Sequence, residues 1–391
     1  MSLAKPPRSS HVLLICGGLW HTMLGIPLLL HRAGCKITLV CPPAHPASLS
    51  RFIGRVLHYT GDNSVAIDFV RSLLVKEKFD HTIWTDESML RDVIRREDDP
   101  VLAASLPVPP SGEGGMVASS KAGLAQFAPQ AGVSVPASRV CHTVDEAISF
   151  LEHGSRGDAI LKPLHSAGGG GVMRVKTADE IRACATTNDT PFLIQDYITG
   201  KVGVTEMVMN RGQLLGWIAS WKTANLDHAF GPSTRRVLCA PPDVENQAHA
   251  LGRLTQFTGF CGFDFIEDEK TGKIFVLEFH PRPTAGFMFA LPWGANLHEG
   301  WNNILRGTPV TQIATPASDC LGAERAIFPA ELQRLLKTRD AGGLLKWSAR
   351  LGPVRFLPWQ DPGLIAGVVR YSFYVFARRR RARRARTAPQ R

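Results

Sequence analysis

The stretch CGFDFIEDEKTGKIFVLEFHPRP, residues 261–283, constrains the fold more than any other part of the chain. Two segments with alternating side chains flank the turn sequence EKTG, which predicts an antiparallel β-hairpin. With a regular register, Asp264 lies opposite Glu278. The apolar side chains of the hairpin are then expected to share one face, directed at a core: Phe263, Phe265, Phe275, Leu277 and Phe279.

The other face of this hairpin gathers charged groups. Glu278, His280 and Arg282 alternate along the second strand, so they point to the same side. Two acids directly opposite each other on neighbouring strands repel, and a divalent cation would remove that cost. Carboxylates that retain some bound water suit Mg²⁺. The alternative is a pair of acids on a solvated sheet face.

A second segment carries the features of a phosphate site. In LKPLHSAGGGGV, Lys162 ends a buried strand and is followed by four consecutive glycines, Gly168, Gly169, Gly170 and Gly171. Glycine backbone N–H groups can approach phosphate oxygens closely, and a lysine adds positive charge. A glycine run alone is a weak signal, because it also forms mobile turns.

The first hundred residues read as a small parallel sheet. Residues 11–41 give a strand, a glycine-rich turn, a helix and a second apolar strand, which predicts a βαβ unit. The turn CGGLWH lacks the G-x-G-x-x-G pattern, so nucleotide binding there is not favoured. The segment HTIWTDES, residues 81–88, predicts another strand of this sheet. Asp86 and Glu87 at its carboxyl end are either substrate contacts or caps of the next element.

Four motifs, in order, then resemble the ATP-grasp superfamily. SSKAGLAQFAPQAGVSVPAS resembles its opening lysine helix, and AILKPLHSAGGGGV its second lysine strand and glycine lid. FLIQDYITG is similar to its adenine hinge, and GFDFI…FVLEFHPRP to its metal hairpin. This resemblance covers about residues 106–312. It implies an α/β (α+β) architecture in which the ATP-grasp fold follows a small parallel-sheet βαβ domain.

The resemblance also implies roles for individual residues. Lys121 and Lys162 would contact ATP phosphates, and the lid would be Gly168–Gly171. Arg282 would face the γ-phosphate or an acyl phosphate and, with Lys162, take part in catalysis. The adenine hinge would be lined by Gln195, Asp196, Tyr197 and Ile198. The magnesium ligands, which could also hold Mn²⁺, would be Asp264 and Glu278.

Two positions depart from the family pattern. His280 stands where the family commonly has asparagine, and imidazole is a poorer partner for Mg²⁺ than an amide oxygen. His280 is therefore either a third metal ligand or a hydrogen-bond donor to phosphate or metal-bound water. Near the usual place of a ribose-binding glutamate the chain has Val202, and Glu206 is the expected substitute.

Domain boundaries follow from these motifs and from the Pro- and Gly-rich segment 103–115. We expect an N-terminal βαβ domain over 1–105 and an ATP-grasp domain over 106–312. The latter divides into a lysine and lid part, 106–192, and a hinge and metal part, 193–312. A separate C-terminal segment, 313–391, would contain an amphipathic helix, 362–377, and a basic tail, 378–391.

Composition limits the remaining function classes. The formal net charge is +11, but eight arginines lie in residues 377–391, so the rest of the chain is only weakly basic and nucleic-acid binding is not favoured. The eight cysteines show no zinc spacing, and we read them as buried small hydrophobic residues in a reducing compartment. The hydrophobic run near the N-terminus is too short for a signal peptide, which predicts a cytoplasmic protein.

The C-terminal sequence DPGLIAGVVRYSFYVFARRRRARRARTAPQR combines an amphipathic helix with an arginine run. This combination is typical of a peripheral anchor on an anionic membrane surface. A helix docked on the body with a free basic tail, and a nucleic-acid contact, are the alternatives.

The resemblance implies an ATP- and Mg-dependent ligase that activates a carboxylate as an acyl phosphate and joins it to an amine or similar nucleophile, with release of ADP. Its partners would be small-molecule carboxylates and amines. Two alternatives stay open: carboxyphosphate or carbamoyl-phosphate chemistry, and a membrane-tethered nucleotide-binding scaffold without catalysis.

Overall fold

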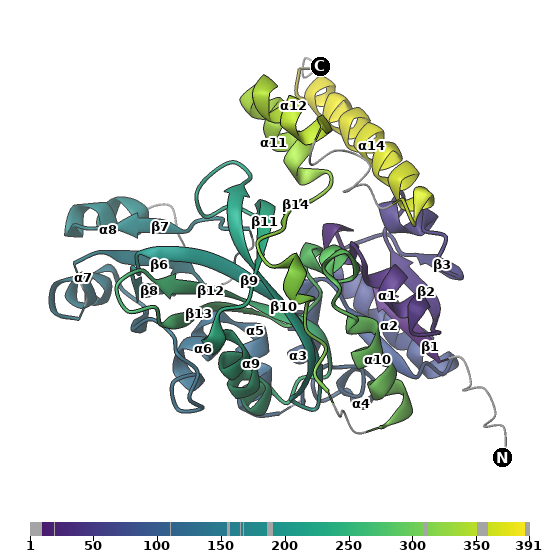
Figure 1. Ribbon diagram of the computed structural model, residues 1–391, viewed down its shortest axis with the longest axis horizontal. Helices are drawn as coiled ribbons and strands as arrows, with labels where there is room; N and C mark the ends of the chain where they lie inside the picture. The colour runs from purple at the N-terminus through teal and green to yellow at the C-terminus, as the bar shows by residue number, and fades with distance from the viewer. Residues whose placement is uncertain are drawn as a thin grey trace.

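The computed structural model describes residues 10–18, 20–109, 111–154, 157–164, 166, 168–185, 191–308, 312–349 and 359–387, the last twelve of these as backbone only. Three β-sheets organise this part of the chain (Figure 1). The glycine lid and its sheet lie at one end of the molecule, the first sheet lies at the other, and the largest sheet lies between them.

The first sheet has four parallel strands in the order β3-β2-β1-β4. The pairing of β1 (His11–Ile15) with β2 (Lys36–Cys41) around α1 (Ile26–Arg32) confirms the predicted βαβ unit. Helices and short 3-10 turns complete this region, with the bounds β3 Arg55–His58, β4 His81–Trp84, η1 Trp20–Met23, η2 Pro46–Leu49, α2 Asn63–Lys76, α3 Glu87–Ile94 and α4 Pro100–Ala103.

The second sheet is small and antiparallel, in the order β5-β8-β6-β7. Its strands are β5 Ser138–Cys141, β6 Ala159–Pro163, β7 Met173–Val175 and β8 Phe192–Asp196. Helices α7 (Val144–His153) and α8 (Ala178–Ala185) supply Ile148, Leu151 and Ile181 to its core. Because β6 and β7 are neighbours, the glycine run that joins them projects from the edge of this sheet.

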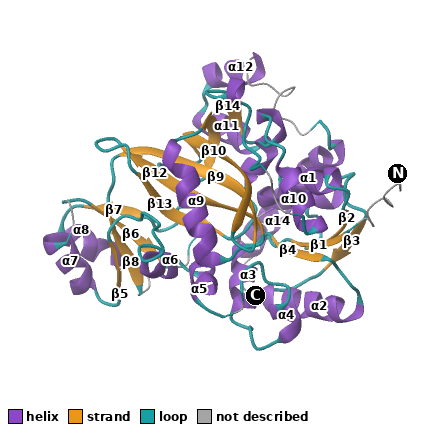
Figure 2. Cartoon of the chain, turned by 60° about the horizontal axis from the view of Figure 1, so that its bottom comes forward, coloured by secondary structure: helices purple, strands orange, loops and turns teal. Residues whose placement is uncertain are grey.

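The largest sheet has six antiparallel strands in the order β13-β12-β9-β10-β11-β14. Its strands are β9 Gly200–Asn210, β10 Gln213–Asn225, β11 Ser233–Cys239, β12 Gly259–Asp268, β13 Ile274–His280 and β14 Glu324–Ala326. Figure 2 shows α9 (Pro242–Thr255) lying across it. Two short helices, α5 (Glu113–Ser119) and α6 (Lys121–Phe127), lie near its β13 side, and Ser120 caps α6.

The β12–β13 hairpin confirms the expected pairing of Asp264 with Glu278, but its register is not regular throughout. A bulge follows this pair, so that Phe265 lies opposite Val276 and Leu277 is the extra residue. Val276 and Ile274 therefore join the core with the buried phenylalanines of β12. The prediction that Phe275 and Leu277 face this core was wrong, because a one-residue shift exchanges the two faces of a strand.

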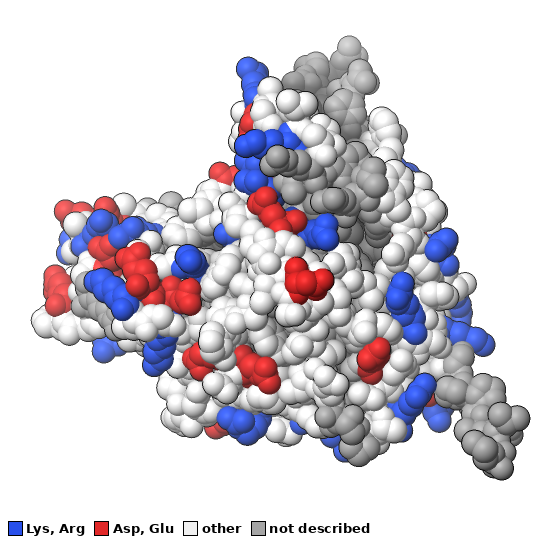
Figure 3. Space-filling model, viewed as in Figure 1, with Lys and Arg blue, Asp and Glu red and all other residues white. Residues whose placement is uncertain are grey.

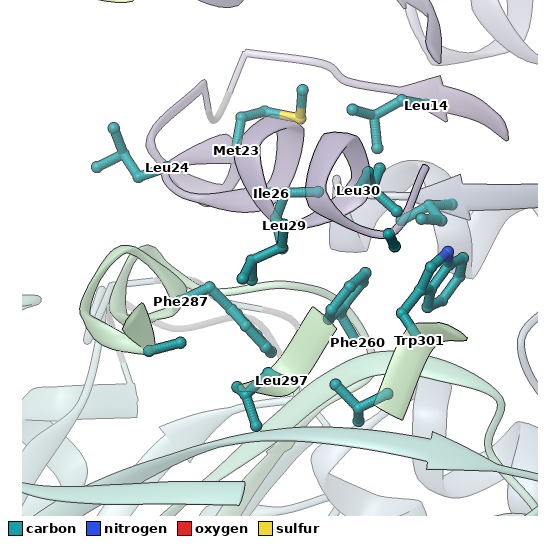
Figure 4. Packing of buried hydrophobic residues seen from close by; sticks show 14 of the residues in the cluster. Leu14, Met23, Leu24, Ile26, Leu29, Leu30, Phe260, Phe287, Leu297 and Trp301 are labelled. Carbon is teal, nitrogen blue, oxygen red and sulfur yellow. The ribbon is translucent and has the colours of Figure 1, made fainter. Parts of the chain in front are cut away.

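A shared apolar core joins the first sheet to the six-stranded sheet. Figure 4 shows Ile26 and Leu29 of α1 directed toward Phe260 of β12 and Phe287 of η3 (Ala285–Phe289). Phe260 also stacks on Trp301 of α10 (Leu297–Arg306), with ring centroids 4.8 Å apart. All these side chains are essentially buried. The β4 edge of the first sheet is thus held close to the β12–β13 hairpin.

The C-terminal segment is attached to the body at two places. Strand β14 adds an edge to the six-stranded sheet. The turns η4 (Leu291–Trp293) and η5 (Ser318–Cys320) precede β14 in the chain, and α11 (Ala330–Thr338), which contacts β11 and α12 (Ala341–Ala349), follows it. The last helix, α14 (Pro362–Thr387), packs on η2 through the buried side chains of Leu364 and Val368.

This last helix differs from its prediction in length. It continues to residue 387, whereas the sequence reading ended it at 377. The basic tail, 378–391, lies outside the described side chains. Among the helices that the structure describes, none is both long enough and apolar enough to cross a bilayer.

Burial of the cysteines follows the sequence interpretation. Seven of the eight are buried and Cys320 is half-buried. The boundaries of the three predicted domains remain predictions.

Candidate active site

Three potential metal ligands converge where β12 and β13 meet. Asp264, Glu278 and His280 offer ligand atoms that all lie within 4.8 Å of one another. The strand pairing and the period-two geometry place them on the sheet face opposite the phenylalanine core. Two carboxylates and one imidazole form a donor set that fits a divalent cation and includes the hard oxygens that Mg²⁺ prefers. Their role as ligands stays a prediction.

Each carboxylate is held by a lysine. Lys121 Nζ lies 3.2 Å from Glu278 Oε1, and Lys222 Nζ lies 2.6 Å from Asp264 Oδ2. His280 Nε2 lies 3.2 Å from the second oxygen, Asp264 Oδ1. Burial raises the pKa of Asp264, but Lys222 and His280 outweigh it and hold the pKa well below its usual range. Burial opposes ionisation of Glu278 too, and Lys121 and His280 lower its pKa overall.

Lys162 enters the same site from the small sheet. Its ammonium donates a hydrogen bond to Gln195 Oε1 at 2.7 Å, and its side chain is buried. Burial and the nearby charge of Lys121 together lower the pKa of Lys162 to about 8, against the attraction of Glu278. The two lysines expected to contact phosphate therefore lie close enough to influence each other and the carboxylates of Asp264 and Glu278.

The glycine lid has the backbone that only glycine adopts readily. Gly168, Gly169 and Gly171 have φ angles of 63°, 74° and 71°. A Cβ on Gly169 would lie 2.1 Å from the carbonyl oxygen of Phe230, in the connection between β10 and β11. The lid, which includes Gly170, therefore packs against this connection.

The predicted adenine hinge lies at the end of β8 and just beyond it. Gln195, Asp196 and Ile198 are buried. The Arg174 guanidinium lies over the Tyr197 ring, 3.8 Å from its centroid. Because the amide oxygen of Gln195 accepts a hydrogen bond from Lys162, the Gln195 side chain links the expected hinge to Lys162. Adenine contact by this segment stays a prediction.

Glu206 does not lie at an exposed position suited to ribose. It is fully buried in β9, its Oε1 lies 2.6 Å from Arg236 Nη1, and it accepts a hydrogen bond from Thr284 Oγ1 at 2.6 Å. This placement argues against the expected ribose contact. The sequence alone does not predict this pairing, because Arg236 is thirty residues away and belongs to another strand, β11.

Arg282 connects the metal hairpin with the first sheet. Its Nη2 lies 3.2 Å from Glu87 Oε2, at the start of α3, and its Nη1 donates to the carbonyl oxygen of Pro283. Within the described part of the chain, the buried Nε of Arg282 has no hydrogen-bond partner. Asp86 instead caps α3, accepting from the Ser88 backbone N–H at 3.0 Å. Of the two acids singled out in the sequence, Glu87 reaches the site and Asp86 serves as a cap.

Lys222 is the site residue that sequence reasoning did not separate from its neighbours. From the sequence alone, Lys222 resembles His228, Arg235 and Arg236, as a basic residue of a loop that either contacts anions or faces solvent. In the structure, strand β10 continues through Lys222 and ends at Asn225. This extension directs the ammonium of Lys222 at Asp264. A strand extending past Trp221 was the available signal, but Lys and Asn are weak strand formers.

The sequence itself matches no family model and no curated protein. Solved structures are similar in fold. An L-amino acid ligase from Bacillus licheniformis is 19% identical with a TM-score of 0.56, over 76% of this chain and 75% of that one. N5-carboxyaminoimidazole synthetase from Staphylococcus aureus is 12% identical with a TM-score of 0.59, over 78% and 79%.

A third similar structure is the biotin carboxylase domain of 2-oxoglutarate carboxylase from Hydrogenobacter thermophilus, in complex with MgADP, ADP and bicarbonate. It is 13% identical with a TM-score of 0.60, over 78% of this chain and 71% of that one. These are ATP-grasp structures, and identities this low establish the architecture alone. The chain therefore has the ATP-grasp fold, as the order of its sequence motifs predicts.

Proposed function

We propose that this protein is an ATP- and Mg²⁺-dependent ligase that phosphorylates a carboxylate and transfers the acyl group to an amine or similar nucleophile. The observation that carries the proposal is the convergence of Asp264, Glu278 and His280 on one spot beside Lys121 and Lys162. Phosphoryl transfer depends mainly on positioning and on neutralising negative charge, and this arrangement supplies both.

The chain's own residues divide this work. Lys121 and Lys162 would bind the phosphates, and Gly168–Gly171 would cover them and exclude water. When bound, Mg²⁺ would neutralise phosphate charge from Asp264 and Glu278. Arg282 would bind the carboxylate that accepts the phosphoryl group. Its buried Nε–H donor has no acceptor among the described groups.

The neighbourhood of Arg282 supports a carboxylate and an amine as the two organic substrates. Glu87 places a negative charge 3.2 Å from the guanidinium, at the carboxyl edge of the first sheet. A cation and an anion held side by side can orient groups of opposite charge. The similar L-amino acid ligase structure supports the same reaction class.

Oxygen transfer tests the acyl phosphate directly. Candidate carboxylates labelled with ¹⁸O would be incubated with MgATP and amine pools, and the released phosphate analysed by mass spectrometry. The proposal expects one carboxylate oxygen in the phosphate and ADP as the nucleotide product. Hydroxylamine should trap the intermediate as a hydroxamate. AMP and pyrophosphate as products would contradict the proposal.

Carboxyphosphate chemistry is the second candidate, supported by the similar biotin carboxylase domain bound to bicarbonate. It predicts bicarbonate-dependent ADP release without any organic acid. Carbamoyl-phosphate formation would require ammonia as well. A nucleotide-binding scaffold is the remaining alternative, and it predicts MgATP binding with no ADP release under any of these conditions.

For the last helix we propose a peripheral contact with an anionic membrane surface, which would place a cytoplasmic enzyme at the membrane. Leu364 and Val368 are used for docking on the body, but Val369, Phe373 and Tyr374 of α14 are 51%, 70% and 45% exposed. The arginine run continues the same helix in sequence. Aromatic side chains next to a polybasic segment suit an anionic headgroup layer.

Vesicle flotation tests this contact. Binding to phosphatidylserine vesicles should exceed binding to phosphatidylcholine vesicles and weaken with salt. Removal of residues 378–391 should abolish it, and Phe373→Ser should weaken it without altering the docked half of the helix. Equal binding by the truncated protein would rule the contact out. Figure 3 shows that Lys and Arg side chains also gather over α11 and α12, so a truncation control is necessary.

A further inference from the structure

We propose that Lys222 is an internal counter-ion that holds Asp264 until a nucleotide phosphate takes its ammonium, so that nucleotide and metal favour each other's binding. This inference rests on the proposed function of the same site. It assigns a role to a lysine that belongs to neither of the two lysine motifs in the sequence.

The first support is that the metal carboxylates already have cationic partners. Lys222 Nζ lies 2.6 Å from Asp264 Oδ2, and His280 Nε2 takes the other oxygen. Lys121 Nζ lies 3.2 Å from Glu278 Oε1. A cation held between Asp264 and Glu278 would therefore compete with two ammonium groups for these carboxylates.

The displaced ammonium needs a new partner. The side chain of Lys222 is 14% exposed, and an unpaired charge at such a position is costly. A phosphate bound near Lys121 and Lys162 would supply that partner. If metal bound without nucleotide, the ammonium of Lys222 would lose its partner. If nucleotide bound without metal, its phosphate would have to compete with Asp264 for this ammonium.

The surroundings of Lys222 give it room to move. It lines a cavity of about 550 Å³ between the β10–β11 connection and α11. The other charged side chains of its wall are already paired, Lys337 with Asp227 and Arg334 with Glu331. Lys222 therefore borders open space into which its side chain can turn when it leaves Asp264.

Metal binding without nucleotide and nucleotide binding without metal test this assignment separately. Mn²⁺ binding without nucleotide would be followed by electron paramagnetic resonance, and ATP binding in EDTA by calorimetry. For Lys222→Met, we expect Mn²⁺ affinity to rise about tenfold and metal-free ATP affinity to fall about tenfold, within the usual 5- to 150-fold span of coupling between sites. Lys222→Gln provides a second variant if the first folds poorly.

Lys337→Met is the matched control. Lys337 lines the same cavity but pairs with Asp227, and its side chain is 66% exposed. The Lys337→Met substitution should leave Mn²⁺ affinity unchanged. Opposite shifts in the two Lys222 measurements distinguish a counter-ion from a merely structural ion pair, whose loss would weaken both.

The outcomes separate this inference from the proposed function. If both Lys222 variants bind MgATP but show unchanged or weaker Mn²⁺ binding, the counter-ion role is wrong and the ligase proposal stands. If the wild-type protein binds neither Mn²⁺ nor MgATP, both are wrong.

Discussion

At the scale of single residues, Lys162 makes the site sensitive to pH. Because its pKa is lowered to about 8 from the usual 10.5, the folded protein loses this proton in a range where the unfolded chain keeps it. The sign follows: between about pH 8 and 10.5 the unfolded state binds more protons, so this group's contribution to the free energy of unfolding rises with pH. Phosphate binding needs the protonated form and should weaken over the same range.

We therefore expect ATP affinity to fall by up to about tenfold per pH unit above pH 8, with proton uptake on binding. Calorimetry in buffers of different ionisation enthalpy measures both quantities. Lys162→Arg should retain binding and lose this dependence, because arginine stays charged. A wild-type affinity that is flat from pH 7 to 10 would contradict the assignment.

Residue identity and spacing were enough to predict the residues that converge here, but not their partners. The register opposing Asp264 to Glu278 follows from the hairpin turn and is confirmed. The burial of Glu206 against Arg236 could not be predicted, because the pair joins two strands that meet only in the folded sheet. The partner of Lys222 could not be predicted either, because Asp264 lies on a different strand of the folded sheet.

At the scale of elements, the lid depends on a close backbone approach. Gly168 and Gly169 both have positive φ, so alanine at either position costs about 1–2 kcal/mol of backbone strain. Only at Gly169 would the added Cβ collide with a backbone carbonyl, at 2.1 Å, whereas at Gly168 it meets Pro232 at an ordinary 3.5 Å. Gly169→Ala should therefore weaken MgATP binding more than Gly168→Ala.

Equilibrium binding of a fluorescent ATP analogue would rank the two variants, and hydrogen exchange over 168–175 would report the lid itself. Equal losses in both variants would mean that the contact with the β10–β11 connection has no part in closing the lid.

Long periodic elements were predictable and short or irregular ones were not. The parallel first sheet and the β9–β10 hairpin follow from apolar runs and the Arg-Gly turn, whose two residues both have positive φ. The bulge at Leu277 and the short strand β14 have no local signature, since tertiary pairing creates them. The helix α14 ran past its predicted end because arginine is a good helix former.

At the scale of the whole molecule, the ion pair between Glu87 and Arg282 joins the first sheet to the metal hairpin. Glu87→Gln removes the charge but keeps the shape of the side chain. We expect the Michaelis constant for an organic substrate to rise at least about fivefold while MgATP affinity changes less than twofold, because Glu87 pairs with Arg282, whereas Lys121 pairs with Glu278 and Lys162 with Gln195.

Steady-state kinetics with the substrates found in the oxygen-transfer assay would measure this split. Asp86→Ala serves as the structural comparison, because it removes a helix cap worth about 1 kcal/mol and leaves Arg282 paired. A loss of MgATP affinity in Glu87→Gln equal to its effect on the organic substrate would place Glu87 in the nucleotide site instead.

The most direct test of the central claim is the thermal unfolding midpoint with and without a nonhydrolysable MgATP analogue, for the wild type and Glu278→Gln. A ligand at a hundred times its dissociation constant adds about 2.7 kcal/mol to the free energy of unfolding. The account predicts a clear upward shift in the wild type and a much smaller one in the variant, which keeps the side-chain shape but loses a metal-binding charge. No shift in the wild type, or an equal shift in both proteins, would contradict an ATP and metal site at this hairpin.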